Sequence, residues 1–248
     1  MKALGRWLAV LLCAALALQL FFIARIALSA WWDPQSTSFQ RSEMWRIWQQ
    51  SAQQRHWQQQ WVDYPRISPH LKRAVLTAED DGFVDHDGVQ WDAIERAWER
   101  NQQALERAQQ ALERAQRSQR LSAKPVPIYG GSTITQQLAK NLLLSGERSF
   151  LRKGQELVLA HALELFLSKE RILEIYLNNV EWGQGIFGAE AAARHYFRKS
   201  AQQLSPAESA RLAVMLPRPR YYEQNPQSRY LQSRTSAILR RMATTPLP

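Results

Sequence analysis

The stretch GGSTITQQLAKNLLLSG, residues 130–146, contains the signals for the start and the end of one helix. Thr133 follows two glycines, and Gln136 lies three positions further on, which is the capping-box pattern of a helix N-terminus. Gly146 follows the last leucines, at a place where glycine commonly ends a helix. The stretch therefore predicts a helix with well-defined ends.

The two faces of this helix differ in chemistry. Apolar side chains recur at intervals of four residues and form one face: Ile134, Leu138 and Leu142. Polar side chains form another face: Thr133, Gln137 and Lys140. A helix N-terminus with a hydroxyl, an amide and an ammonium group along one face can hold a phosphate or a sugar. An ordinary amphipathic helix with one solvated face is the alternative interpretation.

A second informative stretch is TAEDDGFVDHDG, residues 77–88, which combines acidic side chains with a phenylalanine and a histidine. The Ser-Pro pair at 68–69 predicts the start of the helix that leads into it. Glu79 continues the apolar row of Leu71 and Val75, so we expect a partly desolvated carboxylate with a raised pKa, suited to accept a proton. A surface glutamate at a helix end is the alternative.

The N-terminal segment predicts a membrane anchor. Residues 7–23 contain Gln19 as their only strongly polar side chain, and the apolar character continues to residue 32. Lys2 and Arg6 predict a cytoplasmic N-terminus by the positive-inside rule. A signal peptide cleaved near residue 30 is the competing interpretation. The single cysteine, Cys13, lies inside the apolar run, so no disulfide within the chain is expected.

Composition favours a mostly helical domain of about 200 residues after the anchor. The 248 residues include 32 Lys and Arg against 22 Asp and Glu, a formal charge of +10. This charge suits an anionic or membrane-surface partner, and it suits nucleic acid equally well. Residues 33–43 are expected to form a linker, and residues 44–61 a helical segment rich in tryptophan. The heptad QQALERA occurs twice in residues 102–115, which predicts a helix ending near Ser122.

Several segments together resemble a known family. They are EDDGFVDHDG at 79–88, GGSTITQQLAKN at 130–141, RKGQE at 152–156, RILEIYLNNVEWGQGIFG at 171–188 and LSPAESARLAVMLPRP at 204–219. In this order they resemble the motifs of the bacterial peptidoglycan glycosyltransferases, glycosyltransferase family 51. The chain is most similar to monofunctional members, because little sequence follows these motifs. The helix at 102–122 is longer than expected between the first two motifs.

The resemblance implies a mainly α, lysozyme-like domain that polymerises lipid II by inverting transfer of undecaprenyl-pyrophosphate-linked glycan to the GlcNAc 4-hydroxyl. Glu79 matches the catalytic general base, and Glu156 matches the second glutamate, which would orient cations. The residues matched to the leaving pyrophosphate are Lys140, Arg152 and Lys153, with Arg148 nearby. The residues matched to sugar and phosphate positioning are Thr133, Gln137, Phe83 and His86. Asp80 and Asp81 are interpreted as local hydrogen-bonding groups.

The resemblance also sets expectations for cofactors, partners and location. No tightly bound cofactor and no protein metal site are expected, although Mg²⁺ or Mn²⁺ bound through the substrate diphosphate fits the chemistry. The expected partners are lipid II, the lipid-linked glycan and the membrane, without nucleic acid, and other cell-wall synthases stay open. The expected location is the inner membrane, with a single pass and a periplasmic catalytic domain. The expected divisions of the chain are 1–6 cytoplasmic, 7–32 anchor, 33–64 linker and Trp-rich segment, 65–226 catalytic domain and 227–248 basic helix.

Two other classes of protein are alternatives to a peptidoglycan glycosyltransferase. A muramidase or other lytic enzyme would share the fold and a catalytic acid, but it would not need Lys140, Arg152 and Lys153 grouped for a pyrophosphate. A non-enzymatic membrane scaffold would explain the anchor and the heptads, but not the polar face of the helix in 130–146.

Overall fold

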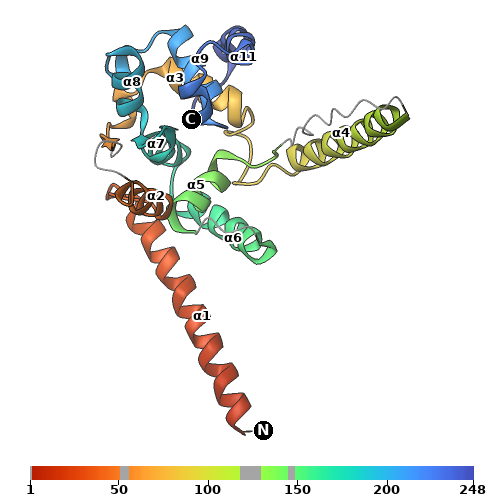
Figure 1. Ribbon diagram of the computed structural model, residues 1–248. Helices are drawn as coiled ribbons and strands as arrows, with labels where there is room; N and C mark the ends of the chain where they lie inside the picture. Colours follow the sequence, from red (N-terminus) through yellow and green to blue (C-terminus); the bar gives the residue numbers. More distant parts are fainter. Residues whose placement is uncertain (1, 51–55, 118–129, 145–148) are drawn as a thin grey trace.

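The computed structural model describes residues 2–50, 56–117, 130–144 and 149–248, and the described part is mainly helical, as predicted (Figure 1). The helices are α1 (Lys2–Leu28), α2 (Ser38–Trp48), α3 (Pro69–Glu79), α4 (Trp91–Arg117), α5 (Ile134–Leu143), α6 (Phe150–Phe166), α7 (Lys169–Asn179), α8 (Ala189–Phe197), α9 (Pro206–Met215), α10 (Pro219–Gln224) and α11 (Arg229–Arg241). Short 3-10 turns are η2 (Tyr64–Arg66), η3 (Ala201–Gln203) and η4 (Met242–Thr244).

The only sheet in the described residues is small. Its strands are β1 (Gln58–Gln59), β2 (Glu181–Gly183) and β3 (Ile186–Phe187), in the order β1-β3-β2. β1 runs parallel to β3 with Gln58 opposite Ile186, and β2 runs antiparallel to β3. The sheet thereby attaches the segment after α2 to the chain that follows α7.

The helix starts that carry the site are those predicted from the sequence. The Ser68 hydroxyl accepts a hydrogen bond from the backbone N–H of His70, and Pro69 occupies the first turn of α3. Thr133 and Gln136 form both halves of the capping box that begins α5. These caps satisfy backbone N–H groups that a helix start otherwise leaves unpaired, so the local sequence fixes where both helices begin.

The core forms around α3 and α5. α3 packs against α9 and α11, while α5 packs against α2, α6 and α7. The apolar rows predicted for both helices are buried: Leu71, Val75, Ile134, Leu138 and Leu142 are each at most 2% exposed. The ends of α3 and α5 are therefore held by packing on several sides, which gives the side chains there fixed positions.

α1 extends away from the domain (Figure 1), and it is long and apolar enough to cross a membrane. It is attached to the domain by polar contacts at two places. The side-chain amides of Gln19 and Gln155 exchange hydrogen bonds of 2.7 and 2.9 Å. Just after α1, Arg171 donates to the carbonyl of Ser29 and to Asp33, each at 2.8 Å. The anchor and the domain thus share specific contacts.

Two sequence predictions for the flanking segments were wrong. Residues 38–43 are helical, because Thr37 and Gln40 form a capping box that starts α2 inside the expected linker. The tryptophan-rich region is not one helix, since α2 ends at Trp48 and residues 58–59 form a strand. The C-terminal helix is capped by Ser228. The helix containing the heptads is confirmed up to Arg117, and its expected end near residue 122 lies outside the described residues.

Candidate active site

Two adjoining cavities lie at the junction of α3 and α5. The larger has a volume of about 770 Å³ and is lined by residues of α3, α4, α5 and α11. The smaller has a volume of about 360 Å³ and reaches the start of α6. Both cavities are lined by Gln137, Lys140 and Leu216, so the polar face of α5 forms a wall that the two cavities share.

Glu79 ends α3 and lines the larger cavity. Its Oε2 atom accepts a hydrogen bond of 3.0 Å from the side-chain amide of Gln137. Burial raises the pKa of Glu79 above its ordinary value of 4.5, and the neighbouring Asp80 adds to the rise. The Gln137 hydrogen bond and the positive charges of Arg234 and Lys140 act in the opposite direction. The predicted partly desolvated carboxylate is thus present at the end of the apolar row.

Gln137 is itself oriented by Tyr176, a residue that was not among those predicted. The Tyr176 hydroxyl donates to the Gln137 carbonyl oxygen at 3.1 Å, which leaves the amide N–H₂ directed at Glu79. Tyr176 is 1% exposed, and burial raises the pKa of its phenol well above the ordinary value. Its position four residues after the apolar Ile172 is a usable sequence signal, because a hydroxyl in a buried row needs a partner.

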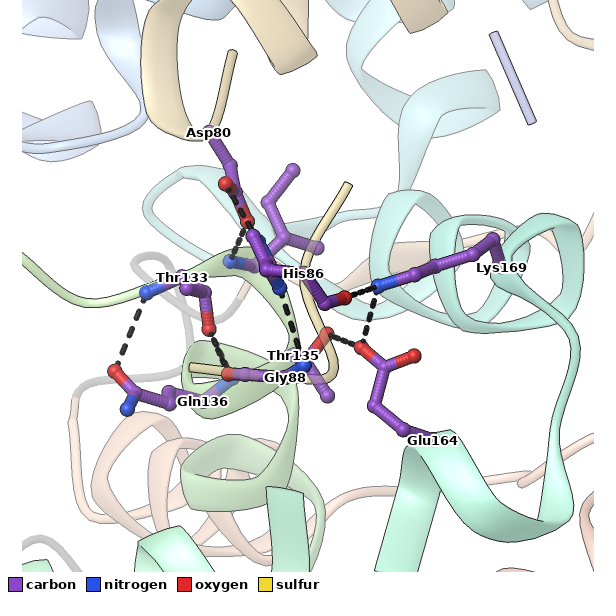
Figure 2. A network of polar contacts seen from close by, with 9 residues as sticks. Asp80, His86, Gly88, Thr133, Thr135, Gln136, Glu164 and Lys169 are labelled. Atoms are coloured by element: carbon purple, nitrogen blue, oxygen red, sulfur yellow. Dashed lines mark hydrogen bonds and ion pairs between the residues drawn. The ribbon is translucent and has the colours of Figure 1, made fainter. Parts of the chain in front are cut away.

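Asp80, next to Glu79, connects the loop after α3 to the start of α5 (Figure 2). Its Oδ2 atom accepts from the backbone N–H of Ile134 at 2.9 Å, and its Oδ1 atom lies 2.9 Å from Nε2 of His86. The N–H of Gly88 donates to Nδ1 of His86, so the histidine carries its proton on Nε2 and donates to Asp80. Asp80 therefore acts as the local hydrogen-bonding group that the sequence predicted, and it fixes the backbone beside Glu79.

The same loop is also held from α6 and α7 (Figure 2). Lys169 donates to the carbonyl of His86 at 2.5 Å and to Glu164 at 2.8 Å, and Glu164 also accepts from the Thr135 hydroxyl at 2.7 Å. Gly88 has φ +85°, and a Cβ atom there would lie 3.0 Å from the side chain of Glu164. The backbone at this point therefore needs glycine for both its conformation and its space.

Three of the predicted positioning residues are engaged within the protein. Phe83 is 1% exposed and packs in the core, and His86 is bonded to Asp80, so neither side chain is among those lining the cavities. Thr133 borders the larger cavity, but its hydroxyl donates to the carbonyl of Gly88 and accepts from the N–H of Gln136. Gln137 and Lys140, in contrast, line both cavities directly.

The predicted cations at the start of α6 surround a buried carboxylate. Glu156 is 3% exposed and accepts from Lys153 at 2.5 Å, while Nη1 of Arg152 lies 3.6 Å from its other oxygen. Lys153 also donates to the Ser132 hydroxyl, which links this group to the turn before α5. Arg152 lines the smaller cavity beside Lys140. Glu156 is therefore a buried member of this ion-pair group, and Arg148 lies outside the described residues.

Further cations line the larger cavity and were not predicted from the sequence. Arg96 and Arg100 come from α4, and Arg234 and Arg241 from α11. Arg241 pairs with Asp81 at 3.0 Å across an exposed edge. The C-terminal helix was expected to be basic, but its contribution to this cavity depends on how it packs against α3, which the sequence does not show.

In the part of the chain that the structure describes, no three His, Cys, Asp or Glu side chains come together in a group that could hold a metal ion. Asp80 accepts from His86 and Ile134, and Glu156 accepts from Lys153.

The fold and the cavities define a class of enzyme. A partly desolvated carboxylate that can remove a proton lies beside cations that can receive an anionic group, on a helical domain with an apolar N-terminal helix. Residues 46–243 match the family described as Transglycosylase. The chain belongs to this family and is an enzyme of the transglycosylase class.

Similar proteins extend over nearly the whole chain. The chain is 50% identical over 248 residues to a biosynthetic peptidoglycan transglycosylase of Bordetella avium, which covers all of this chain and 96% of that protein. It is 48% identical over 236 residues to the protein of the same name from Herminiimonas arsenicoxydans, covering 94% of this chain and 92% of the relative. The relative from Paraburkholderia phytofirmans is 47% identical over 247 residues.

Proposed function

We propose that this protein is a peptidoglycan glycosyltransferase that polymerises lipid II into linear glycan strands. The observation that carries the proposal is the position of Glu79 and Lys140 on the wall of one cavity, with Lys140 also lining the adjoining cavity beside Arg152. One substrate can then lose a proton in the first cavity while the other loses its pyrophosphate in the second.

The reaction proposed for this site is the one that the resemblance to glycosyltransferase family 51 implies. The 4-hydroxyl oxygen of the GlcNAc of lipid II attacks C1 of the terminal MurNAc of the lipid-linked glycan, and Glu79 takes the hydroxyl proton. The bond between C1 and the phosphate oxygen breaks, and undecaprenyl pyrophosphate leaves with the electron pair. Attack on the face opposite the leaving group converts the α-linked donor into a β-1,4 linkage. A raised pKa keeps Glu79 basic enough for this task near neutral pH.

The smaller cavity suits the pyrophosphate. Lys140 and Arg152 both line it, and fixed cations stabilise the charge that develops as the anomeric bond breaks. Nε and Nη1 of Arg152 are buried and donate no hydrogen bond to any other atom within the described residues. Buried donors of this kind are costly unless a partner arrives, and a phosphate oxygen is a suitable partner. Mg²⁺ or Mn²⁺ carried by the diphosphate is compatible with this assignment and would screen its charge.

The remaining predicted residues are assigned supporting roles. Glu156 neutralises and orients Arg152 and Lys153 without contacting the sugar. His86 and Phe83 position Glu79 through Asp80 and through core packing, and Thr133 does so through the cap of α5. Gln137 orients the Glu79 carboxylate and, as a lining residue of both cavities, is placed to contact a substrate.

The location of the cavities is consistent with lipid-linked substrates. α6, which carries Arg152, packs beside α1 and exposes a row of apolar side chains, with Leu151, Val158 and Leu165 between 54% and 88% exposed. Apolar surface next to an anchor helix suits a lipid environment. We place α1 in the inner membrane with the N-terminus in the cytoplasm and the catalytic domain in the periplasm, in agreement with Lys2 and Arg6.

The test is polymerisation by the purified full-length protein in detergent, with radiolabelled lipid II as the only substrate. We expect polymer that a muramidase degrades completely, together with release of undecaprenyl pyrophosphate in equal amount to the bonds formed. Absence of polymer from the folded protein would overturn the proposal. Release of soluble fragments from purified sacculi, without polymer from lipid II, would instead establish a lytic enzyme.

A further inference from the structure

The larger cavity contains more positive charge than the reaction proposed above uses. Among the described residues, five cationic side chains line it: Arg96 and Arg100 from α4, Lys140 from α5, and Arg234 and Arg241 from α11. Lys140 also lines the smaller cavity, and it is assigned above to the leaving pyrophosphate. The four arginines have no role in that step, and they are called the α4–α11 arginines below.

The acids that line the larger cavity do not balance these cations. They are Glu79, Asp80 and Asp81 among the described residues, and Asp80 is already engaged in holding the loop after α3. The charge of Arg234 acts on Glu79, and no carboxylate in the part of the chain that the structure describes lies within ion-pair distance of Arg234. A cavity with an excess of one charge attracts a ligand of the opposite charge, so this cavity suits an anionic group.

The position of α11 restricts which anionic group can reach its arginines. α6, which carries Arg152, packs beside α1, whereas α11 lies at the end of the domain away from α1 (Figure 1). The diphosphate of lipid II is joined directly to the lipid, so it stays at the membrane. The diphosphate therefore suits the cations beside α6, and the α4–α11 arginines suit an anionic group that projects from the sugars.

The stem peptide of lipid II is a group of this kind. It is attached to MurNAc, and it carries carboxylates. The GlcNAc whose 4-hydroxyl meets Glu79 is joined to this MurNAc, so the peptide of the acceptor begins one sugar away from the general base. Glu79 and the four arginines line the same cavity. A guanidinium group is planar and can donate two parallel hydrogen bonds to one carboxylate, which suits arginine to this ligand.

We propose that the α4–α11 arginines bind the stem-peptide carboxylates of the acceptor lipid II and thereby determine which acceptor the enzyme uses. The proposal rests on the function proposed above and adds a specificity site to it. The two pairs of arginines come from helices that are far apart in the sequence, and the acceptor peptide contacts both helices.

The first experiment measures the use of the acceptor alone. A radiolabelled lipid II analogue with a methylene group in place of the oxygen on C1 of MurNAc cannot lose its pyrophosphate, so its label enters polymer only when the analogue acts as an acceptor. The analogue is made with free stem-peptide carboxylates and with these groups converted to carboxamides. Each form is added to unlabelled lipid II and the purified full-length protein. The carboxylate form should have a KM about tenfold lower than the carboxamide form, because hydrogen bonds between charged groups are lost in the latter.

The second experiment removes arginines from the cavity. Arg234→Gln with Arg241→Gln removes two positive charges that line it. Arg229→Gln with Arg240→Gln is the matched control, because it removes two exposed charges from the same helix outside the cavity. The cavity variant should use the carboxylate form no better than the carboxamide form, and the control should keep the wild-type preference. The carboxamide form is the reference, since any effect of Arg234 on Glu79 changes the use of both forms equally.

Two results would overturn this proposal while polymerisation of lipid II continues. One is an equal KM of the wild type for both forms, since the carboxylates would then not be recognised. The other is a parallel loss of both forms in the cavity variant, which would place the arginines at the sugars or at the diphosphate. Absence of polymer from unlabelled lipid II with the wild type would overturn the proposed function itself, and this proposal with it.

Discussion

Glu79 lines the larger cavity, and Glu156 is buried beside Arg152, which lines the smaller one. The surroundings of these two carboxylates are opposite. Glu79 has a neutral amide as its hydrogen-bonding partner, and burial raises its pKa. Glu156 is buried between two cations, with Lys153 at 2.5 Å and Arg152 at 3.6 Å. The same side chain is therefore suited to take up a proton at the end of α3 and to hold two cations in place at the start of α6.

The difference comes from what each helix terminus supplies. The last turn of α3 supplies no cation to Glu79. Its charged neighbours are Asp80, which is next in the chain, and Arg234 and Lys140, which line the same cavity. The first turns of α6 contain the sequence Arg-Lys-Gly-Gln-Glu, which places both cations within one helical turn of the carboxylate. The two carboxylates therefore have different partners, a neutral amide at Glu79 and two cations at Glu156.

The largest effect should come from Glu79→Gln. We expect the polymerisation rate to fall about 100-fold or more, the scale of lost general-base catalysis. Because the folded-state pKa of Glu79 is raised, ionising it lowers the stability as the pH rises from the ordinary value of 4.5 through the raised pKa, so the neutral variant should keep or increase the Tm at neutral pH. Initial rates and thermal unfolding measure both. Asp85→Asn, an exposed acid in the same loop, is the control and should stay within a few-fold of wild type.

Glu156→Gln should affect stability and substrate binding. Loss of a charged partner for Lys153 and Arg152 should lower the free energy of unfolding by about 2 kcal/mol and raise the KM for the lipid-linked donor. Chemical denaturation and the KM for the donor measure this, with the exposed Glu170→Gln as control. Unchanged stability together with an unchanged KM would contradict a role of Glu156 in holding the two cations.

Gln137→Leu should move the acidic limb of the pH–rate profile to higher pH. The amide hydrogen bond favours the ionised form of Glu79, so its loss raises the pKa further, and activity is then lost earlier as the pH falls. The wild-type limb itself should lie above the ordinary glutamate value of 4.5. The profile of kcat/KM against pH measures the shift. A limb that stays in place would mean that Gln137 contacts substrate without setting the proton affinity of Glu79.

Tyr176→Phe should give the smallest effect, in the same direction. The variant removes the hydroxyl that orients Gln137, with a cost of about 1 kcal/mol in stability and a smaller rise of the acidic limb. Because Tyr176 acts through Gln137, combining the two substitutions should shift the limb no further than Gln137→Leu alone. Additive shifts would instead indicate that Tyr176 influences Glu79 directly.

Local features of the site were predictable, and contacts between distant elements were not. The caps at Ser68 and Thr133 depend on a few consecutive residues, and the row that ends at Glu79 depends on helical periodicity, so the sequence shows both. The bond from Tyr176 to Gln137 depends on how α7 lies against α5, and no local pattern encodes that. The linker prediction failed for another reason. The polar composition of residues 33–43 is typical of a linker, whereas the capping box of Thr37 and Gln40 starts a helix there.

The hydrogen bonds between Gln19 and Gln155 have a consequence for the height of the active site above the membrane centre. Gln19 lies 17 residues after Lys2, or about 26 Å along α1, close to the thickness of the hydrocarbon layer. In the orientation proposed above, with Lys2 at the cytoplasmic surface, this pair would lie near the outer boundary of the lipid chains. Arg152 lies in the first turn of the same helix as Gln155, so its guanidinium would lie close to that boundary. The proposed pyrophosphate site would then be at the depth of the lipid phosphates, and lipid-linked substrates would not need to rise out of the bilayer to react.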